Sequence, residues 1–489
     1  MSAPAVQSGS DSGDGRSQAA REDRLVVQTS GPSPPERQGE GIAEVGDGPP
    51  ALPGSEAGSP DGSRRVDFAA VLGRVAGANP QVAFANQRVR EALAQLRAAQ
   101  TLWLPSIRAG VSYNKHEGSL QAVEGPVSDV SRSAMESGLG VAGAGAGSPP
   151  VPGVLASFRL TDAVFQPQIA DQATAARQEA ATATLHDVLL AVALAYLDLL
   201  RAHQQNAIAE ETLAHAQQLA DLTAAFARAG QGSEADADRA RAELAVRKND
   251  RARAEEATKV ASARLAELLS WEPTRPLVPS ESEMVAMELV APETPLPQLV
   301  AHGLSSRPEL AEARHLVSEA VCRLERERYA PLVPSVLLGA SYGGFGGGPG
   351  STVTNFRDRL DLDAAAFWEL RMLGAGERAA REEARARIQQ ARLRQVQVMD
   401  RVAREIVEAH AQVESRRGQI AVAQSGVKAA EDSYRRNLER IRGGQGLPIE
   451  VLQSIQALDQ SRREYLRAVA EYNEAEFRLH RALGWPIEP

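Results

Sequence analysis

Three acids, Glu234, Asp236 and Asp238, are the residues whose types and spacing could do chemistry. They follow a Gly-Gln-Gly turn at 230–232. Carboxylates gathered in this way can bind divalent cations or select for them. The same acids stand in the first turn of a predicted helix, where the helix dipole favours negative side chains without any ligand. Both interpretations stay open for these residues.

No other part of the chain predicts a reactive site. The eight histidines show no pair at i, i+4 spacing, so no metal site is predicted. The glycine-rich run 343–350 lacks the Gly-Lys-Ser/Thr of a phosphate loop and is interpreted as a loop. We find neither a nucleophile elbow nor a distinct carboxylate pair. The chain is therefore predicted to be no enzyme and to need no cofactor.

Composition indicates long helices and excludes some partners. The 489 residues carry a net charge of −9, which gives no electrostatic reason to expect nucleic acid. Ala, Arg, Glu, Gln and Leu dominate, as in helices that pack side by side. The most apolar window, 188–200, is too short for a membrane-spanning helix. Residues 1–63 are rich in Gly, Ser and Pro, and we expect disorder there, with no export signal visible.

The sequence repeats itself in outline. LPSIRAGVSY at 104–113 matches VPSVLLGASY at 333–342, and GQG occurs at both 230–232 and 444–446. Trp271 and Trp485 follow the two GQG turns at the same distance. A period this long predicts a duplicated, domain-sized module rather than a solenoid.

Each half predicts two strands and two long helices. Residues 103–114 alternate between apolar and polar side chains, which is typical of a strand with one apolar face. We expect the segment 117–153 to be a loop. The predicted boundaries are as follows: a disordered segment 1–63; a first repeat 64–273 with a β-hairpin 103–166 and a helical hairpin 167–271 whose tip lies near 230–233; a linker 274–299; and a second repeat 300–489 with a β-hairpin 333–371 and a helical hairpin 374–484 whose tip lies near 443–448. The second strand of each half is expected at 154–165 and 359–371.

These elements are incomplete within one chain. A two-stranded hairpin is marginal in water, and four strands do not close a barrel. Several chains that pool their strands would remove the sheet edges and turn apolar side chains to lipid. We therefore predict a homo-oligomer with a β part at one end and long bundled helices at the other.

The order of elements and several motifs resemble the TolC-like outer-membrane efflux family. The matching segments are SRPEL at 306–310, FWELRMLGAGERAA at 367–380, the tips RAGQGSEADADRARAEL at 228–244 and RGGQGLPIEVLQSIQAL at 442–458, and the endings ARLAELLSWEP at 263–273 and FRLHRALGWP at 477–486. The resemblance spans about 66–486. It implies a mainly α fold with a small β part, in which a trimer forms a 12-stranded β-barrel continuous with a long α-helical barrel.

The resemblance also implies a function and partners. The chain would be the outer-membrane exit duct of a tripartite efflux or type I secretion system, extending into the periplasm and contacting a periplasmic membrane-fusion adaptor and, through it, an inner-membrane pump. The expected adaptor-docking and gating residues are Arg228, Gly230, Gln231 and Gly232 at the first tip and Arg442, Gly444, Gln445, Gly446 and Leu447 at the second. In a trimer, Glu234, Asp236 and Asp238 would form an acidic ring at the entrance.

A second class of function stays open, a soluble or periplasmic coiled-coil scaffold without channel activity. Acidic helices and the lack of a visible export signal suit it. The amphipathic strand pairs favour the channel, because a scaffold has no use for them. The transported substrate is not indicated by the sequence.

Overall fold

The computed structural model describes residues 63–104, 106–107, 109–139 and 154–485. All of them belong to one compact unit, Leu52–Pro489. Residues 1–62 of the segment predicted to be disordered, and residues 140–153 of the predicted loop 117–153, lie outside the described residues.

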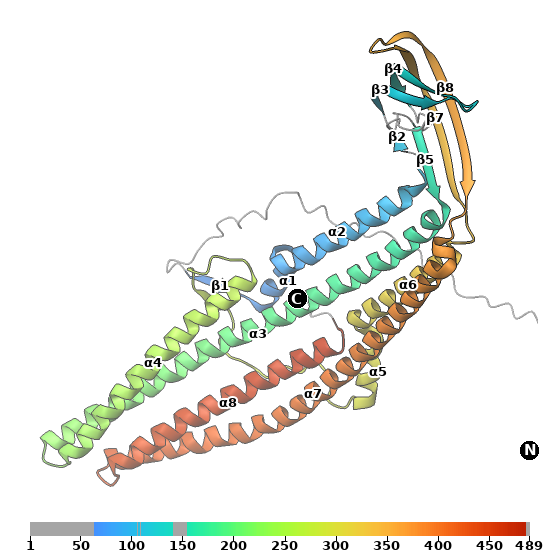
Figure 1. The fold of residues 1–489 in the computed structure, drawn as a ribbon. Coiled ribbons are helices and arrows are strands. Elements are labelled where there is room, and N and C mark those ends of the chain that lie inside the picture. Colours follow the sequence, from blue (N-terminus) through green and yellow to red (C-terminus); the bar gives the residue numbers. More distant parts are fainter. Residues whose placement is uncertain (1–62, 105, 108, 140–153, 486–489) are drawn as a thin grey trace, which may run out of the picture. The chain divides into compact units, whose positions relative to one another are not determined.

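The helices form a layer of four columns (Figure 1). The described residues contain eight α-helices: α1 (Phe68–Ala78), α2 (Pro80–Gln100), α3 (Leu160–Arg228), α4 (Glu234–Leu268), α5 (Leu296–Ser306), α6 (Pro308–Tyr329), α7 (Ala375–Arg442) and α8 (Pro448–Ala482). The long helices α3 and α7 each make a full column. Between them α6 and α8 follow one another, and α2 and α4 follow one another on the outer side of α3. At 1.5 Å per residue, α3 and α7 are each about 100 Å long.

Helix α3 begins earlier than the sequence predicts. The expected strand 154–165 ends at Arg159, and Pro167 lies inside the helix rather than at its start. Proline removes one backbone hydrogen bond there. Thr161 and Ala163 are nevertheless buried in helical conformation, so packing outweighs the local preference.

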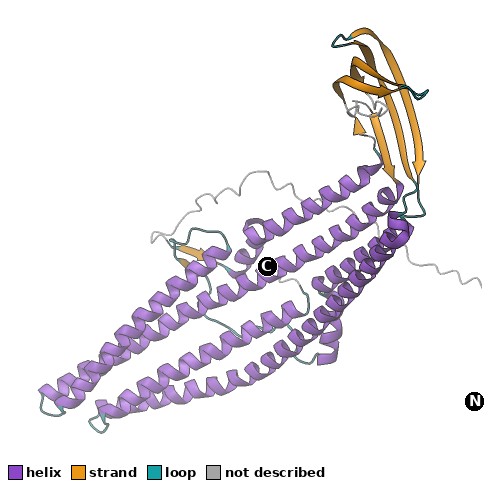
Figure 2. Ribbon diagram, in the orientation of Figure 1, coloured by secondary structure: helices purple, strands orange, loops and turns teal. Residues whose placement is uncertain are grey.

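The sheet has four strand positions, all antiparallel to their neighbours (Figure 2). Its strands are β2 (Ser106–Ile107), β3 (Ala109–Gln121), β4 (Val127–Leu139), β5 (Val154–Arg159), β7 (Ser335–Pro349) and β8 (Thr354–Phe367). On one side of β7 lies β8. On its other side β5 pairs with residues 335–340 and β4 with residues 342–349, so β4 and β5 occupy one position in succession. Beyond them, β2 pairs with β5 and β3 pairs with β4.

Two predicted loops are strands. Most of 117–139 belongs to β3 and β4, and all but the last residue of the glycine-rich run 343–350 forms the end of β7. The glycines permit close pairing, since a Cβ on Gly138 would lie 2.6 Å from the Cα of Gly343 on the opposite strand. The glycines that predict a loop in the sequence are needed here because only they allow the two strand backbones to approach so closely.

One face of the helix layer is covered by two segments, residues 64–78 and 277–306, which we call the covering segments. They contain α1, α5 and a two-stranded parallel sheet of β1 (Arg64–Val66) and β6 (Leu277–Pro279). Leu72 and Leu277 pack into one apolar cluster with Val192 and Tyr196 of α3. A second cluster joins Leu299 to α7 and α8. These two clusters lie between the layer and the covering segments, and a third cluster joins α3, α4, α7 and α8 near their tips.

Candidate functional site

Both long helices end in the same glycine turn. Gly230 after α3 has φ +72°, and Gly444 after α7 has φ +74°. In each case the next residue, Gln231 or Gln445, donates its amide to the carbonyl oxygen five residues earlier at 2.9 Å. This is the Schellman helix end, which requires a left-handed residue and therefore favours glycine. The repeated GQG is explained by the backbone at both tips.

The side chains around the two turns differ. At the first tip the Ser233 hydroxyl caps α4 by accepting from the Ala235 amide at 3.1 Å. At the second tip Leu447 is 61% exposed and Ile449 is 38% exposed. The remaining residues that the sequence assigned to the tips lie at or near the surface: Arg228, Gly232, Arg442 and Gly446. One tip therefore presents polar groups and the other an apolar pair.

Two of the three tip acids already have partners. Asp236 pairs with Arg239 at 3.4 Å, and Asp238 pairs with Arg241 at 2.5 Å. Glu234 is exposed. The acids thus lie together beside the first tip, but arginines one turn further along α4 balance part of their charge. Among the described residues no group of three or more His, Cys, Asp or Glu side chains could hold a metal ion.

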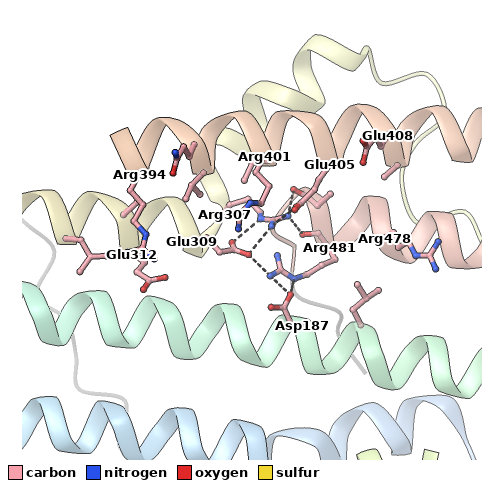
Figure 3. A pocket seen from close by; sticks show the side chains of 18 of the residues that line it. Asp187, Arg307, Glu309, Glu312, Arg394, Arg401, Glu405, Glu408, Arg478 and Arg481 are labelled. Atoms are coloured by element: carbon pink, nitrogen blue, oxygen red, sulfur yellow. Dashed lines mark hydrogen bonds and ion pairs between the residues drawn. The ribbon is translucent and has the colours of Figure 1, made fainter. Parts of the chain in front are cut away.

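A cluster of ion pairs around two buried arginines lies where α6 and α8 meet (Figure 3). Arg307, just before α6, is 6% exposed. It donates to the last carbonyl oxygen of α8 at 3.2 Å, to Glu309 at 2.9 Å and to Glu405 of α7 at 2.9 Å. Arg481, near the end of α8, donates to Glu309 and to Asp187 of α3, both at 2.7 Å. Five charged side chains from four helices therefore join the two short helices end to end.

The charges in this cluster support one another. Burial by itself raises the pKa of Glu309, but the guanidinium groups of Arg481 and Arg307 outweigh it and hold that pKa below its usual value. A buried ion that loses its partner is costly, so the cluster depends on all its members.

The junction between α2 and α4 is built in a similar way with uncharged groups. Asn79 caps α2 by accepting from the Gln81 amide at 2.8 Å. Its side-chain amide donates to the Leu268 carbonyl at the end of α4, also at 2.8 Å. Asn79, before Pro80, thus links the start of α2 to the end of α4. Arg307, before Pro308, links the start of α6 to the end of α8 in the same way.

A cavity of about 950 Å³ adjoins the charged junction. Arg177 of α3 and Arg394 and Arg401 of α7 line it together with Glu312 of α6. Within the described part of the chain these three arginines form no ion pair and donate no hydrogen bond; Arg394 and Arg401 are labelled in Figure 3. Burial raises the pKa of Glu312, although Arg177 and Arg394 act to lower it.

Only part of this junction stands out in the sequence. Arg307 and Glu309 belong to the SRPEL segment at 306–310, one of the segments that carry the resemblance to the TolC-like family. Asp187, Glu405 and Arg481 gave no signal, because each is one charge among many on a long helix. Their role depends on helices that meet only in the folded chain.

Helix α3 contains one 18-residue window of mean hydropathy 1.7, long and apolar enough to cross a membrane, and 56% of this window is buried inside the protein. That is also the pattern of a helix in the core of a soluble protein.

Comparison with known proteins identifies the fold and the second half. No curated protein matches the sequence. The outer-membrane channel OprN is 18% identical, with a TM-score of 0.69 over 86% of this chain and 91% of that one. VceC, the outer membrane protein of Vibrio cholerae, is 17% identical, with a TM-score of 0.66 over 86% and 97%. The open MtrE outer membrane channel of Neisseria gonorrhoeae is 17% identical, with a TM-score of 0.66 over 86% and 89%.

Residues 299–485, which contain α5 to α8, β7, β8, the charged junction and the second tip, match the sequence model of the family described as outer membrane efflux protein. Efflux is transport, in agreement with the prediction that the chain is no enzyme. The second half of this chain is therefore an outer membrane efflux protein domain, and the family predicted from the sequence is confirmed.

Proposed function

We propose that this chain is one protomer of a trimeric exit duct in the outer membrane. In this proposal four strand positions from each of three protomers form a 12-stranded barrel. The helices continue it as a tunnel through the periplasm, and an adaptor at the tips links the tunnel to an inner-membrane pump. Substrates pass through unchanged.

One observation carries the proposal: sheet and helix layer are open at the same two edges. β2 and β3 form one edge of the sheet, and α2 and α4 form the edge of the helix layer on the same side. β8 forms the other edge and continues into α7. An open strand edge invites pairing, and two different edges that fit one another give a head-to-tail ring. Closing the ring would pair the open strand edges and pack the open edges of the helix layer in one step.

Both edges carry exposed apolar side chains. On α7, Leu393 is 64% and Val407 is 43% exposed, and they lie two heptads apart. On α4, Val246 and Val260 have the same spacing and are 49% and 44% exposed. Side chains at this spacing pack between neighbouring helices. In a ring with level tips, Val407 would lie near the end of α4 and Leu393 beside α2, which supports contact between α7 of one protomer and the α2–α4 column of the next.

Exposed side chains on the strands suit a lipid surface. Among them are Val111, Tyr113, Leu338, Tyr342, Leu360 and Leu362, all between 46% and 74% exposed. Apolar groups at alternate positions of a closed barrel face lipid. Their exposure in a single protomer supports placement of the sheet in the outer membrane.

We place adaptor docking and gating at the two tips. The glycine turns leave backbone accessible at the surface, and Leu447 and Ile449 offer an apolar contact at the second tip. Glu234, Asp236 and Asp238, multiplied by three, would ring the entrance, with Glu234 as the member whose charge is least balanced. The two tips would contact the adaptor differently, one through polar and one through apolar side chains.

We also infer that the halves 64–273 and 300–489 derive from one duplicated module. Each half has a short helix, a junction, two strand positions, a long helix, a Schellman tip and a returning helix. The matched junctions at Asn79 and Arg307 support this inference.

The test is fractionation of the native host, followed by native mass spectrometry of the detergent-extracted protein. We expect recovery with the outer membrane and a mass of three chains. Recovery as a soluble monomer or dimer would contradict the duct and leave the coiled-coil scaffold.

A further inference from the structure

The cavity beside α6 and α8 opens on the uncovered face of the helix layer. On α3, Tyr196 donates to a backbone carbonyl of the covering segments at 3.1 Å. Asp187 lines the cavity nine positions earlier, about two and a half turns, and so points the opposite way. On α8, Glu476 accepts from the covering segments at 3.2 Å, whereas Arg478, about 200° further round, lines the cavity.

The uncovered face is the one that would line the duct. Three copies of the covering segments inside a ring of helices would fill its passage, whereas outside the ring they have room. This step rests on the proposed function. With the ring closed, each protomer presents its cavity to the lumen at the level of the junction between α6 and α8.

The cavity holds more positive charge than its own acids balance. Asp187, Glu309 and Glu405 are occupied by Arg307 and Arg481. The arginines at 177, 394 and 401 have no such partner among the described residues. The two remaining acids of the lining are Glu312 and Glu408, and Glu408 pairs with Arg404.

A buried donor points to a ligand independently of these charges. Arg481 is 4% exposed and lines the cavity, and its Nη1 atom is buried without a hydrogen-bond acceptor within the described structure. Buried donors in native proteins normally have a partner, and a guanidinium group in particular binds carboxylate, phosphate or sulfonate oxygens.

We propose that this cavity is a binding site for small polyanionic solutes in transit, with Arg177, Arg394 and Arg401 as its anion-binding residues. A volume of about 950 Å³ accommodates a solute of drug size. Arginines on two long helices, across the cavity from one another, suit a rigid molecule with several anionic groups. The duct would then discriminate between substrates by charge along its length.

The test uses the detergent-purified, full-length protein and the fluorescent trisulfonate pyranine, whose binding is followed by fluorescence anisotropy. The variant Arg177→Gln/Arg394→Gln/Arg401→Gln removes the three arginines, which are exposed and therefore dispensable for folding. The control Arg385→Gln/Arg392→Gln/Arg436→Gln removes the same charge from exposed positions of α7 outside the cavity. We expect pyranine affinity to fall about tenfold or more in the first variant and to stay unchanged in the control.

Equal losses in the two variants, or no pyranine binding by the unaltered protein, would overturn the proposal. A separate measurement keeps it distinct from the duct itself. The anion-to-cation permeability ratio of the protein in planar bilayers is expected to fall in the first variant only. Pyranine binding that depends on the three arginines, in a protein that forms no trimer and conducts nothing, would retain the anion site and refute the duct.

Discussion

At the scale of single residues, charge joins helices that the chain does not connect directly. Arg307 and Arg481 reach across from the start of α6 and the end of α8, and Glu309 accepts from both. Arg307 and Arg481 are buried, and Glu309 between them is about one quarter exposed, so these contacts are worth more than an ion pair on the open surface. Glu309, the shared acceptor, is therefore the residue whose loss should be felt most clearly.

We expect Glu309→Gln to lower the free energy of unfolding at pH 7 by about 1.5–3 kcal/mol, since charged hydrogen bonds to two arginines are lost. The pKa of Glu309 is lowered in the folded state, so its contribution is complete above its unfolded pKa of about 4.3. It disappears as pH falls through the lower, folded pKa. Unfolding followed by circular dichroism between pH 7 and pH 3 should therefore show the two proteins converging in acid.

The matched control for this prediction is Glu408→Gln, which alters an exposed acid of α7 paired with Arg404. It should leave stability unchanged at every pH. A Glu309→Gln variant that stays equally destabilised at pH 3 would show that its effect is steric rather than ionic.

At the scale of elements, the tips show how backbone geometry can set sequence. Gly444 is left-handed, and a Cβ added there meets nothing within 4 Å. Gly418 lies at an exposed position in the middle of α7, and a Cβ added there likewise meets nothing within 4 Å. The same change, glycine to alanine, should thus have opposite effects within α7 and in the turn that follows it.

Gly444→Ala is expected to destabilise by about 1 kcal/mol, because alanine strains a left-handed position. Gly418→Ala should stabilise by a similar amount, because alanine favours helix. Thermal unfolding of both variants in detergent measures the pair. Equal shifts of the same sign would show that the tip does not need its left-handed residue.

The elements also show how far the sequence alone could lead. Long helices and their glycine ends follow from composition and from GQG, and both were predictable. The extensions of β3 and β4 were not, because residues 114–121 have no apolar alternation and gain their strand structure from pairing along thirteen positions. The glycine-rich end of β7 was predicted to be a loop for the same reason. Its glycines matter because they let the backbone of the partner strand approach closely. The local sequence pattern predicts which side chains are buried, but it does not predict which strands pair.

At the scale of the whole molecule, one chain leaves two edges of its sheet and helix layer open, and the proposed trimer would close them. The edge formed by α7 should therefore tolerate charge badly even though its side chains are exposed in the protomer. Leu393 and Val407 are the clearest examples.

We expect Leu393→Asp/Val407→Asp to shift the detergent-extracted protein from trimer towards monomer, because charged side chains would be buried between helices. Val285→Asp is the control, since Val285 is 71% exposed in a covering segment away from both edges. Native mass spectrometry reports the outcome. A trimer that survives the double substitution would place the contact between protomers elsewhere.

The junctions also divide the molecule mechanically. A pull applied at either tip travels to the sheet through unbroken backbone in α3 and α7. In the other two columns it must cross a non-covalent seam, spanned by the Asn79 side chain in one and by arginine ion pairs in the other. The returning helix α4 is thus tethered more weakly than α8, and traction on the tips would loosen the first half of the chain before the second.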